Sequence, residues 1–271
     1  MQRFPEINFA LPGKEAARTD FGVMARDEWG VYALVKGVGP VDCSAAPYEQ
    51  ALSAFNQLDV ALSEFGMGFR DVVRTWIYAD GILGWYADLN RARDDFFRSQ
   101  GVGTNGGFVP ASTGIGWSSG GAKIVLGAFA VRAERGGIEV EQLPSPLQCP
   151  ALEYGSQFSR AVEIRTPGWR RIVVSGTASI LPGSQEVAHV GDVDAQVDCT
   201  MRAVEAIYVS RGMGFEDVTG ALVYLKREEY RSAWERWLAH HPEFPCANVR
   251  AMVADVCRPE WLFEIESDAT K

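Results

Sequence analysis

The sequence predicts an α+β fold made of two β-α-β-α-β domains related by internal duplication. The motif Gly-Met-Gly-Phe-x-Asp-Val occurs at Gly66 to Val72 and again at Gly212 to Val218, an offset of 212 − 66 = 146 residues. The similarity continues on both sides without a gap, so that Trp76-Ile77-Tyr78 matches Leu222-Val223-Tyr224. A period this long indicates one folded unit used twice, and 271 residues are enough for two domains of ordinary size.

The first copy alternates strand and helix patterns. An apolar run predicts a strand over Gly30 to Gly37, and a helix follows with Ala51, Leu52, Phe55, Leu58 and Leu62 on one face. Glycines at Gly66 and Gly68 end this helix. The remaining elements are a strand over Asp71 to Tyr78, a helix carrying Trp85, Tyr86, Leu89, Phe96 and Phe97, and a strand over Ala122 to Arg132.

The second copy repeats this order. We expect strands over Arg171 to Gly176, Gly220 to Lys226 and Trp261 to Ser267, with helices over Val193 to Ser210 and Glu228 to His240. Each unit is then a layer of helices on one face of a sheet. The proline-rich stretch Leu143 to Pro150 is the expected linker, which gives an N-terminal domain over residues 1–142 and a C-terminal domain over residues 151–271.

Composition narrows the class of function. Apolar residues make up 47% and charged residues 23%, and no apolar run approaches 18 residues, so we expect a globular protein without a membrane partner. The N-terminus lacks the architecture of an export signal, and five cysteines without a CxxC motif favour reduced thiols in the cytoplasm. The net charge of −9 argues against a nucleic-acid partner. We expect no cofactor and no metal site. Most basic residues are arginines, whose guanidinium groups bind carboxylates, so a small anionic ligand fits the composition.

Two segments differ between the copies and are candidates for a binding site. Ser175, Gly176, Thr177 and Ala178 follow the first strand of copy two, where small residues allow a close backbone approach to a ligand; a simple turn is the alternative. Copy one has Pro110 to Gly116, which includes Thr113 and Gly114, and in isolation this segment favours a turn.

The last strand of copy two carries carboxylates that copy one lacks. Because side chains alternate along a strand, Glu264 and Glu266 share one face of it. That face is either solvated or half buried, and burial would raise the pKa of Glu264 and make it a usable general acid. Arg250 lies on a neighbouring run and is either a ligand anchor or an exposed arginine, whereas Cys257 is typical of a buried, inert thiol.

Several segments together resemble the chorismatase family, in which two Rid (YjgF-type, chorismate mutase-like) halves are fused. They are, in the family's order, Arg74-Thr75-Trp76-x-Tyr78, Asn90-x-x-Arg93, Pro110 to Gly116, Phe158 to Ala161, Ser175 to Ile180, His189 to Gln196, and Ala254 to Arg258 leading to Glu264. These segments span most of residues 70–267.

The resemblance implies cleavage of chorismate to pyruvate and either a dihydroxycyclohexadiene carboxylate or a hydroxybenzoate. It implies that Glu264 protonates the enolpyruvyl methylene group, and that Arg93, Arg160 and Arg250 hold the substrate carboxylates. Tyr78, Thr113, Gly114 and the segment Ser175 to Ala178 would line the pocket between the copies.

Two features depart from the family pattern and keep other functions open. Ile77 replaces the usual asparagine of the first motif, and the N-terminal half is shorter than is typical. The alternatives are a Rid-type enamine or imine hydrolase and a metabolite-binding protein without catalysis. Self-association through Rid-like sheets is a further expectation.

Overall fold

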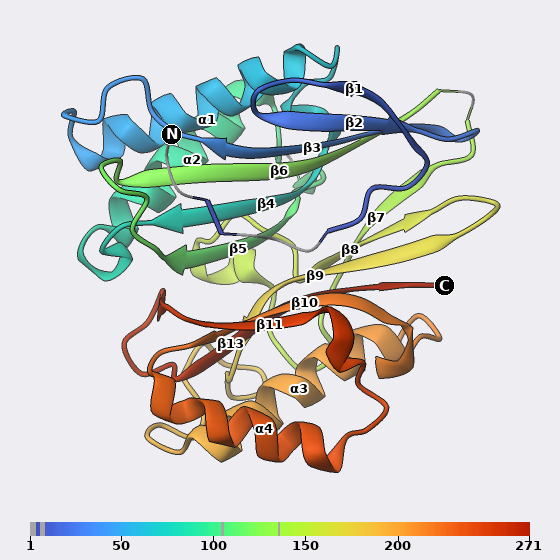
Figure 1. The fold of residues 1–271 in the computed structure, drawn as a ribbon. Coiled ribbons are helices and arrows are strands. Elements are labelled where there is room, and N and C mark those ends of the chain that lie inside the picture. The colour runs from blue at the N-terminus through green and yellow to red at the C-terminus, as the bar shows by residue number, and fades with distance from the viewer. Residues whose placement is uncertain (1–3, 6–8, 104–105, 135) are drawn as a thin grey trace.

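The computed structural model describes residues 4–5, 9–103, 106–134 and 136–271, so residues 1–3, 6–8, 104–105 and 135 of the expected first domain lie outside the described chain. It contains two sheets, each with two helices on one face (Figure 1). The first half contains β1 (Lys14–Arg18), β2 (Gly22–Arg26), β3 (Gly30–Val38), α1 (Pro47–Ser63), β4 (Val72–Ala79), α2 (Tyr86–Gln100), β5 (Ala111–Gly116) and β6 (Ile124–Ala133).

The second half follows the same order. It contains β7 (Glu139–Leu143), β8 (Ala161–Arg165), β9 (Arg170–Ala178), α3 (Val193–Val209), β10 (Val218–Leu225), α4 (Arg231–His240), β11 (Val249–Val253), β12 (Asp255–Val256) and β13 (Phe263–Thr270). Short 3-10 helices cover Phe69–Asp71, Ile82–Gly84, Ala151–Tyr154, Phe215–Asp217, Glu228–Tyr230 and Cys246–Asn248. All the strands and helices expected from the sequence are present, and the α+β fold of two fused repeats is confirmed.

The strand orders of the two sheets show the repeat directly. They are β1-β2-β3-β6-β4-β5-β12 and β11-β10-β13-β9-β8-β7. In each sheet the strand after the first helix pairs in parallel with the strand after the second helix, as β4 does with β5 and β10 with β11. The segment Pro110 to Gly116 therefore contains a strand, β5, and not the turn that its glycines favour in isolation.

Each sheet contains one strand from beyond the expected domain boundary. β7, at the end of the expected first domain, pairs antiparallel with β8 in the second sheet. β12, in the expected second domain, pairs antiparallel with β5 in the first sheet. These crossed pairings tie the repeats together in addition to the linker.

The signature motif adopts the same local structure in both copies. Gly66 has φ of 67° and Gly212 has φ of 68°, the left-handed conformation that ends a helix. Two residues later, the Gly68 N–H donates to the Asp71 carboxylate at 2.9 Å, and the Gly214 N–H donates to Asp217 at 3.0 Å.

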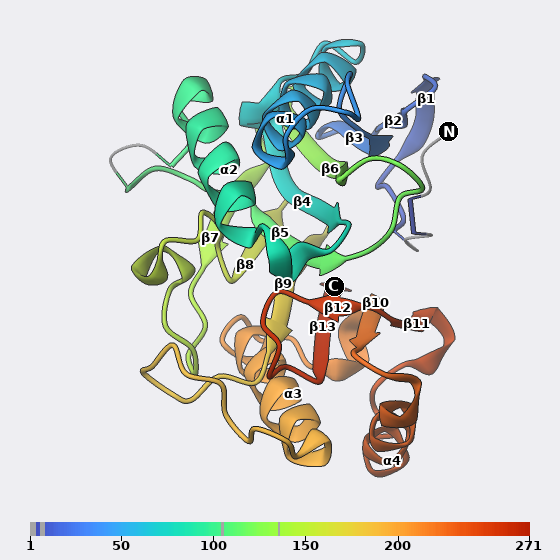
Figure 2. The same cartoon turned by 90° about the vertical axis from the view of Figure 1, so that its left-hand side faces the viewer.

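The helix-free faces of the two sheets pack against each other and form a third core between the repeats. Figure 2 shows this arrangement, with the helices outermost and the sheets facing inward. Tyr78 and Tyr224, equivalent residues 146 positions apart, share a hydrogen bond of 3.0 Å across the interface. The repeats therefore meet through matching strands, β4 and β10.

Replacement of either motif glycine should have the same cost if the repeats are equivalent. A Cβ added at Gly66 or Gly212 meets no atom within 4 Å, so only the left-handed backbone penalises alanine. We expect Gly66→Ala and Gly212→Ala each to lower the free energy of unfolding by about 1–2 kcal/mol, measured by urea denaturation. Gly84→Ala, which also meets open space but without a positive φ, is the control and should change it by less than about 0.5 kcal/mol. A loss in only one of the two motif variants would contradict the equivalence.

Candidate active site

A cavity of about 350 Å³ lies between the two repeats, large enough for a small organic ligand. The first repeat contributes α2 and β5, and the second contributes β9, β13 and the segments around Phe158 and Arg258. Its polar lining residues are Asn90, Arg93, Ser112, Ser156, Arg160, Arg258 and Glu264. Its larger apolar lining residues are Ile77, Leu89, Phe158, Ile180 and Trp261.

Glu264 is the acid of this cavity. It lies on β13, in register with Tyr224 of β10 on one side and Ala178 of β9 on the other, and only 4% of its surface is exposed. The pKa of Glu264 is raised to about 8, mainly by burial and also by the charge of Glu266, with Arg160 acting in the opposite direction. The carboxyl group is therefore largely protonated at neutral pH and can donate a proton.

Gly176 makes room for this carboxyl group. A Cβ at position 176 would lie 2.1 Å from Glu264 Oε1, closer than any real contact. Gly176, in the segment Ser175 to Ala178, therefore leaves space for the Glu264 side chain. This gives a physical reason for glycine at the end of β9.

Arg93 is a buried guanidinium with unused donor capacity. It extends from α2, is 3% exposed, and donates from Nη2 to Asn90 Oδ1 at 2.8 Å. Its buried Nε has no hydrogen-bond partner among the residues that the structure describes. An unpaired buried donor of this kind is costly, so a ligand carboxylate would satisfy it.

Two further arginines line the cavity from the second repeat. Arg160 donates from Nε and Nη2 to the Cys149 carbonyl at 2.9 and 2.7 Å, which fixes the direction of its side chain. Arg258 lies over the Trp261 ring, 5.0 Å from its centroid, and bonds the Gln185 carbonyl. With Glu264 protonated, three guanidinium groups make the cavity positive and suit an anionic ligand.

A thiol and a phenol complete the polar surroundings of Glu264, and both are neutral near pH 7. Burial raises the pKa of Cys257 to about 12, with a contribution from Glu264. Burial also raises the pKa of Tyr86, which lines the cavity from α2. Cys257 is therefore an inert thiol, as expected, and not an activated nucleophile.

The two copy-specific segments meet across the interface, as the sequence predicts for a shared site. The Ser112 N–H donates to Ser175 Oγ at 2.9 Å, and the Gly176 N–H donates to Thr113 Oγ1 at 3.0 Å. Of these segments, Ser112, Gly114, Gly176 and Ala178 line the cavity.

Five predicted binding residues do not line the cavity. Thr113 and Ser175 join the two sheets through the bonds just described, and the Thr177 hydroxyl donates to the Ser175 carbonyl. Tyr78 lies in the inter-sheet core, bonded to Tyr224. Arg250 is in register with Leu222 and so lies on the inter-sheet face of β11, but its side chain is exposed because β11 is the edge strand of the second sheet.

Arg258 and Tyr86 are cavity residues that the sequence did not single out as binding residues. Arg258 follows the short strand β12, and pairing of β12 with β5 brings it to the cavity. The family-like segment Ala254 to Arg258 was the available signal. Tyr86 was expected only as an apolar residue of its helix.

The described part of the chain carries no group of three or more His, Cys, Asp or Glu side chains suited to a metal ion. None of its helices has the length and apolar character needed to cross a bilayer.

Comparisons with known proteins agree with this arrangement. The family model described as Endoribonuclease L-PSP matches residues 151–271. Among solved structures, the chain is similar to a chorismatase at 22% identity and a TM-score of 0.71, over 93% of this chain and 78% of that one. Over most of its length the chain therefore has a fold like that of a chorismatase, and the expected family resemblance is confirmed for the fold.

Shorter proteins match about half of the chain. A putative endoribonuclease L-PSP from Entamoeba histolytica has 17% identity and a TM-score of 0.42, over 49% of this chain and 100% of its own. The YjgF gene product of E. coli has 20% identity and a TM-score of 0.38, over 48% of this chain and 98% of its own. No curated protein matches the sequence.

The positions of Arg93 and Arg250 give a paired test of the cavity. Benzoate, a simple aromatic carboxylate, should bind the wild-type protein, and Arg93→Met should weaken binding at least about 10-fold, the lower end for a charge-assisted hydrogen bond. Arg250→Met, the matched control on the edge strand, should leave the affinity unchanged. Isothermal titration calorimetry measures both, with melting temperatures recorded alongside. Equal losses in the two variants, or none in Arg93→Met, would contradict the location of the site.

Proposed function

We propose that this protein is a chorismatase-like enzyme that removes the enolpyruvyl group of chorismate or a close relative. The products are pyruvate and either a dihydroxycyclohexadiene carboxylate or a hydroxybenzoate. The observation that carries the proposal is a buried carboxyl group, Glu264, in a cavity lined by three guanidinium groups. The chorismatase-like fold of the whole chain supports it.

Glu264 supplies the proton for the first step. Its carboxyl proton passes to the methylene carbon of the enol ether, the alkene electron pair forms the new C–H bond, and an oxocarbenium ion results. In the hydrolytic route, water adds to this cation and loses a proton, and the hemiketal collapses to pyruvate and the ring alcohol. In the route to hydroxybenzoate, ring aromatisation accompanies pyruvate release without net consumption of water. A positioned acid contributes about 10²–10⁴-fold to such a step.

The three arginines suit a substrate with two carboxylates. Arg93 offers its buried Nε from the first repeat, and Arg160 and Arg258 lie on the second-repeat side. With its two carboxylates bound on opposite sides of the cavity, the substrate would have its enol ether close to Glu264. Such positioning lowers the barrier by fixing the reacting groups in advance.

Ile77 favours one alternative within the same site. It places an apolar side chain in the cavity wall where the chorismatase pattern has an asparagine. A substrate with fewer polar groups, such as the enamine of an amino acid, would suit this wall. The alternative function is a Rid-type enamine or imine hydrolase, in which a cavity arginine binds the substrate carboxylate and Glu264 positions water.

The role of Glu264 is tested by isosteric replacement. Glu264→Gln keeps the shape and a hydrogen-bond donor but removes the transferable proton. We expect pyruvate release from chorismate, measured by a coupled lactate dehydrogenase assay, to fall at least about 10²-fold with the fold retained.

Glu163→Gln is the matched control for this substitution. Glu163 is also a buried glutamate of the second sheet, but it pairs with Arg165 outside the cavity. Its replacement should lower the melting temperature without removing the chemistry. Full activity in Glu264→Gln would contradict the mechanism. Ammonia release from an enamine, with no pyruvate from chorismate, would favour the alternative, and binding without turnover would exclude both reactions.

A further inference from the structure

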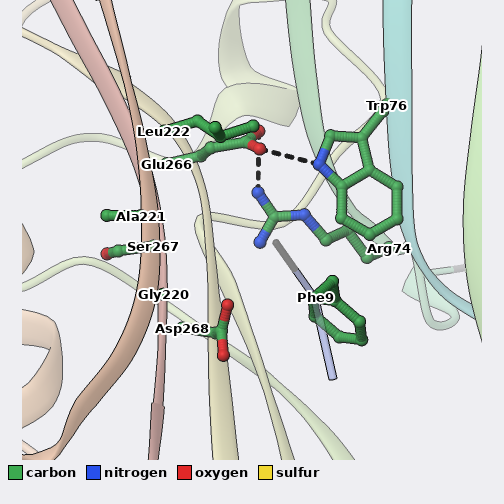
Figure 3. Close-up of a pocket in the computed structure, with 9 residues that line it drawn as sticks. All are labelled: Phe9, Arg74, Trp76, Gly220, Ala221, Leu222, Glu266, Ser267 and Asp268. Carbon is green, nitrogen blue, oxygen red and sulfur yellow. Dashed lines mark hydrogen bonds and ion pairs between the residues drawn. The ribbon is translucent and has the colours of Figure 1, made fainter. Parts of the chain in front are cut away.

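The second acid on β13, Glu266, is held by the first repeat. Its carboxylate accepts a hydrogen bond of 2.7 Å from the indole Nε1 of Trp76 and forms an ion pair of 2.8 Å with Arg74. Both Arg74 and Glu266 are almost fully buried, with 2% and 4% of their side chains exposed. Figure 3 shows both partners directed at the carboxylate, the Trp76 indole from the right and the Arg74 guanidinium from below. A cation and an N–H donor both stabilise the charged form of a carboxyl group.

This charge cluster is not a second ligand site. The cavity beside it is about 20 Å³, room for a single water molecule. Its walls include Phe9, which packs edge-on against Trp76 and closes that side. The electrostatic effect of Glu266, Arg74 and Trp76 is therefore on other groups of the protein and not on a ligand bound beside them.

The group within its reach is the proposed proton donor. Glu264 and Glu266 alternate with Ile265 along β13, so both point to the inter-sheet side, roughly 7 Å apart along the strand. Both are buried, so little water screens the repulsion between two carboxylates. A fixed negative charge at Glu266 therefore opposes ionisation of Glu264.

We propose that Glu266 is a positioning residue whose charge, fixed by Arg74 and Trp76 of the first repeat, keeps the proton on Glu264. Proton loss from Glu264 would place two unscreened charges on one strand face. A carboxylate charge at Glu266, by contrast, is compensated by its two partners. The interface between the repeats thereby favours the protonated form of Glu264.

Other charged and titratable groups around Glu264 act differently. They are Arg74 on β4, Arg160 before β8, Arg93 on α2, Arg258 and Cys257 after β12, Tyr86 on α2, and the Tyr78–Tyr224 pair beside Glu266. The arginines favour the ionised form of Glu264. Burial raises the pKa of the thiol and of the three phenols, so these groups stay neutral near pH 8. Among these neighbours, Glu266 is the carboxylate that favours the protonated form.

The inference rests on the proposed role of Glu264, but the proton can be measured without any substrate. Protein labelled with ¹³C at the glutamate carboxyl carbon is titrated by NMR, and the Glu264 signal is assigned by its absence in Glu264→Gln. In the wild type this carboxyl should titrate near pH 8. Two charges roughly 7 Å apart at an effective dielectric constant of about 20 predict a midpoint about one to two pH units lower in Glu266→Gln.

Two further variants separate charge from packing. Arg74→Met/Glu266→Gln removes both charges, so it avoids an unpaired buried arginine and should fold even if the single variant does not. Its downward shift should be smaller than in Glu266→Gln, because the positive charge of Arg74, which favours ionised Glu264, is lost as well. Glu266→Asp retains the charge and should restore most of the wild-type midpoint.

The inference is overturned if the Glu264 midpoint is unchanged in the double variant, or if it already lies near 4.5 in the wild type. It is also overturned if Glu266→Asp shifts the midpoint as far as the glutamine variants do, because packing would then be the cause. Failure of the proposed function is a different result, in which Glu264 titrates near pH 8 and responds to Glu266 but chorismate yields no pyruvate.

Discussion

Three acidic side chains lie in one row on the buried face of β13, and the organisation of the interface depends on how each is compensated. Glu264 faces Arg160, Glu266 pairs with Arg74, and Asp268 accepts a hydrogen bond from Thr219 near Arg171. A buried carboxylate without such partners would cost several kcal/mol. Arg74 comes from the other repeat, so this requirement fixes the two sheets in one relative position. The need to compensate these buried carboxylates therefore affects both the candidate site and the packing of the two sheets.

The duplication produces two similar sheets, and the candidate site depends on residues that differ between the repeats. Where the repeats remain alike, as at Gly66 and Gly212, the residues end helices and have no role in the cavity. The repeats differ in the strand partners of two equivalent tyrosines. Tyr224 of β10 pairs with Glu264 of β13, whereas Tyr78 of β4 pairs with Val125 of β6. An apolar residue at that place leaves the first sheet without an acid. One interface thus combines a buried glutamate from the second repeat with a buried arginine, Arg93, from the first.

Much of this architecture is readable from the sequence, because a repeat of 146 residues and helical or alternating apolar patterns are local signals. Glu264, Arg93 and Arg160 were identified through the order of the motifs and their family resemblance, and all three line the cavity.

The sequence did not reveal the β1–β2 hairpin or β7 and β8. These strands lie at or near sheet edges, where mixed exposure weakens the apolar alternation. Arg250 was misplaced for a related reason: it lies on the face of β11 that is turned toward the other sheet, but the edge position of this strand leaves it outside the cavity. Arg258 reaches the cavity only through the pairing of β12 with the opposite repeat, and sequence patterns carry no such long-range register.

The central claim is that Glu264 acts as a protonated acid, and the pH dependence of the wild-type enzyme tests it most directly. A carboxyl group with a pKa raised to about 8 is protonated below that pH and loses its proton above it. The value of kcat/KM for pyruvate release from chorismate should therefore be constant between about pH 6 and 7 and fall about tenfold per pH unit well above pH 8. A rate that stays constant to pH 9.5, or that rises with pH, would contradict the account.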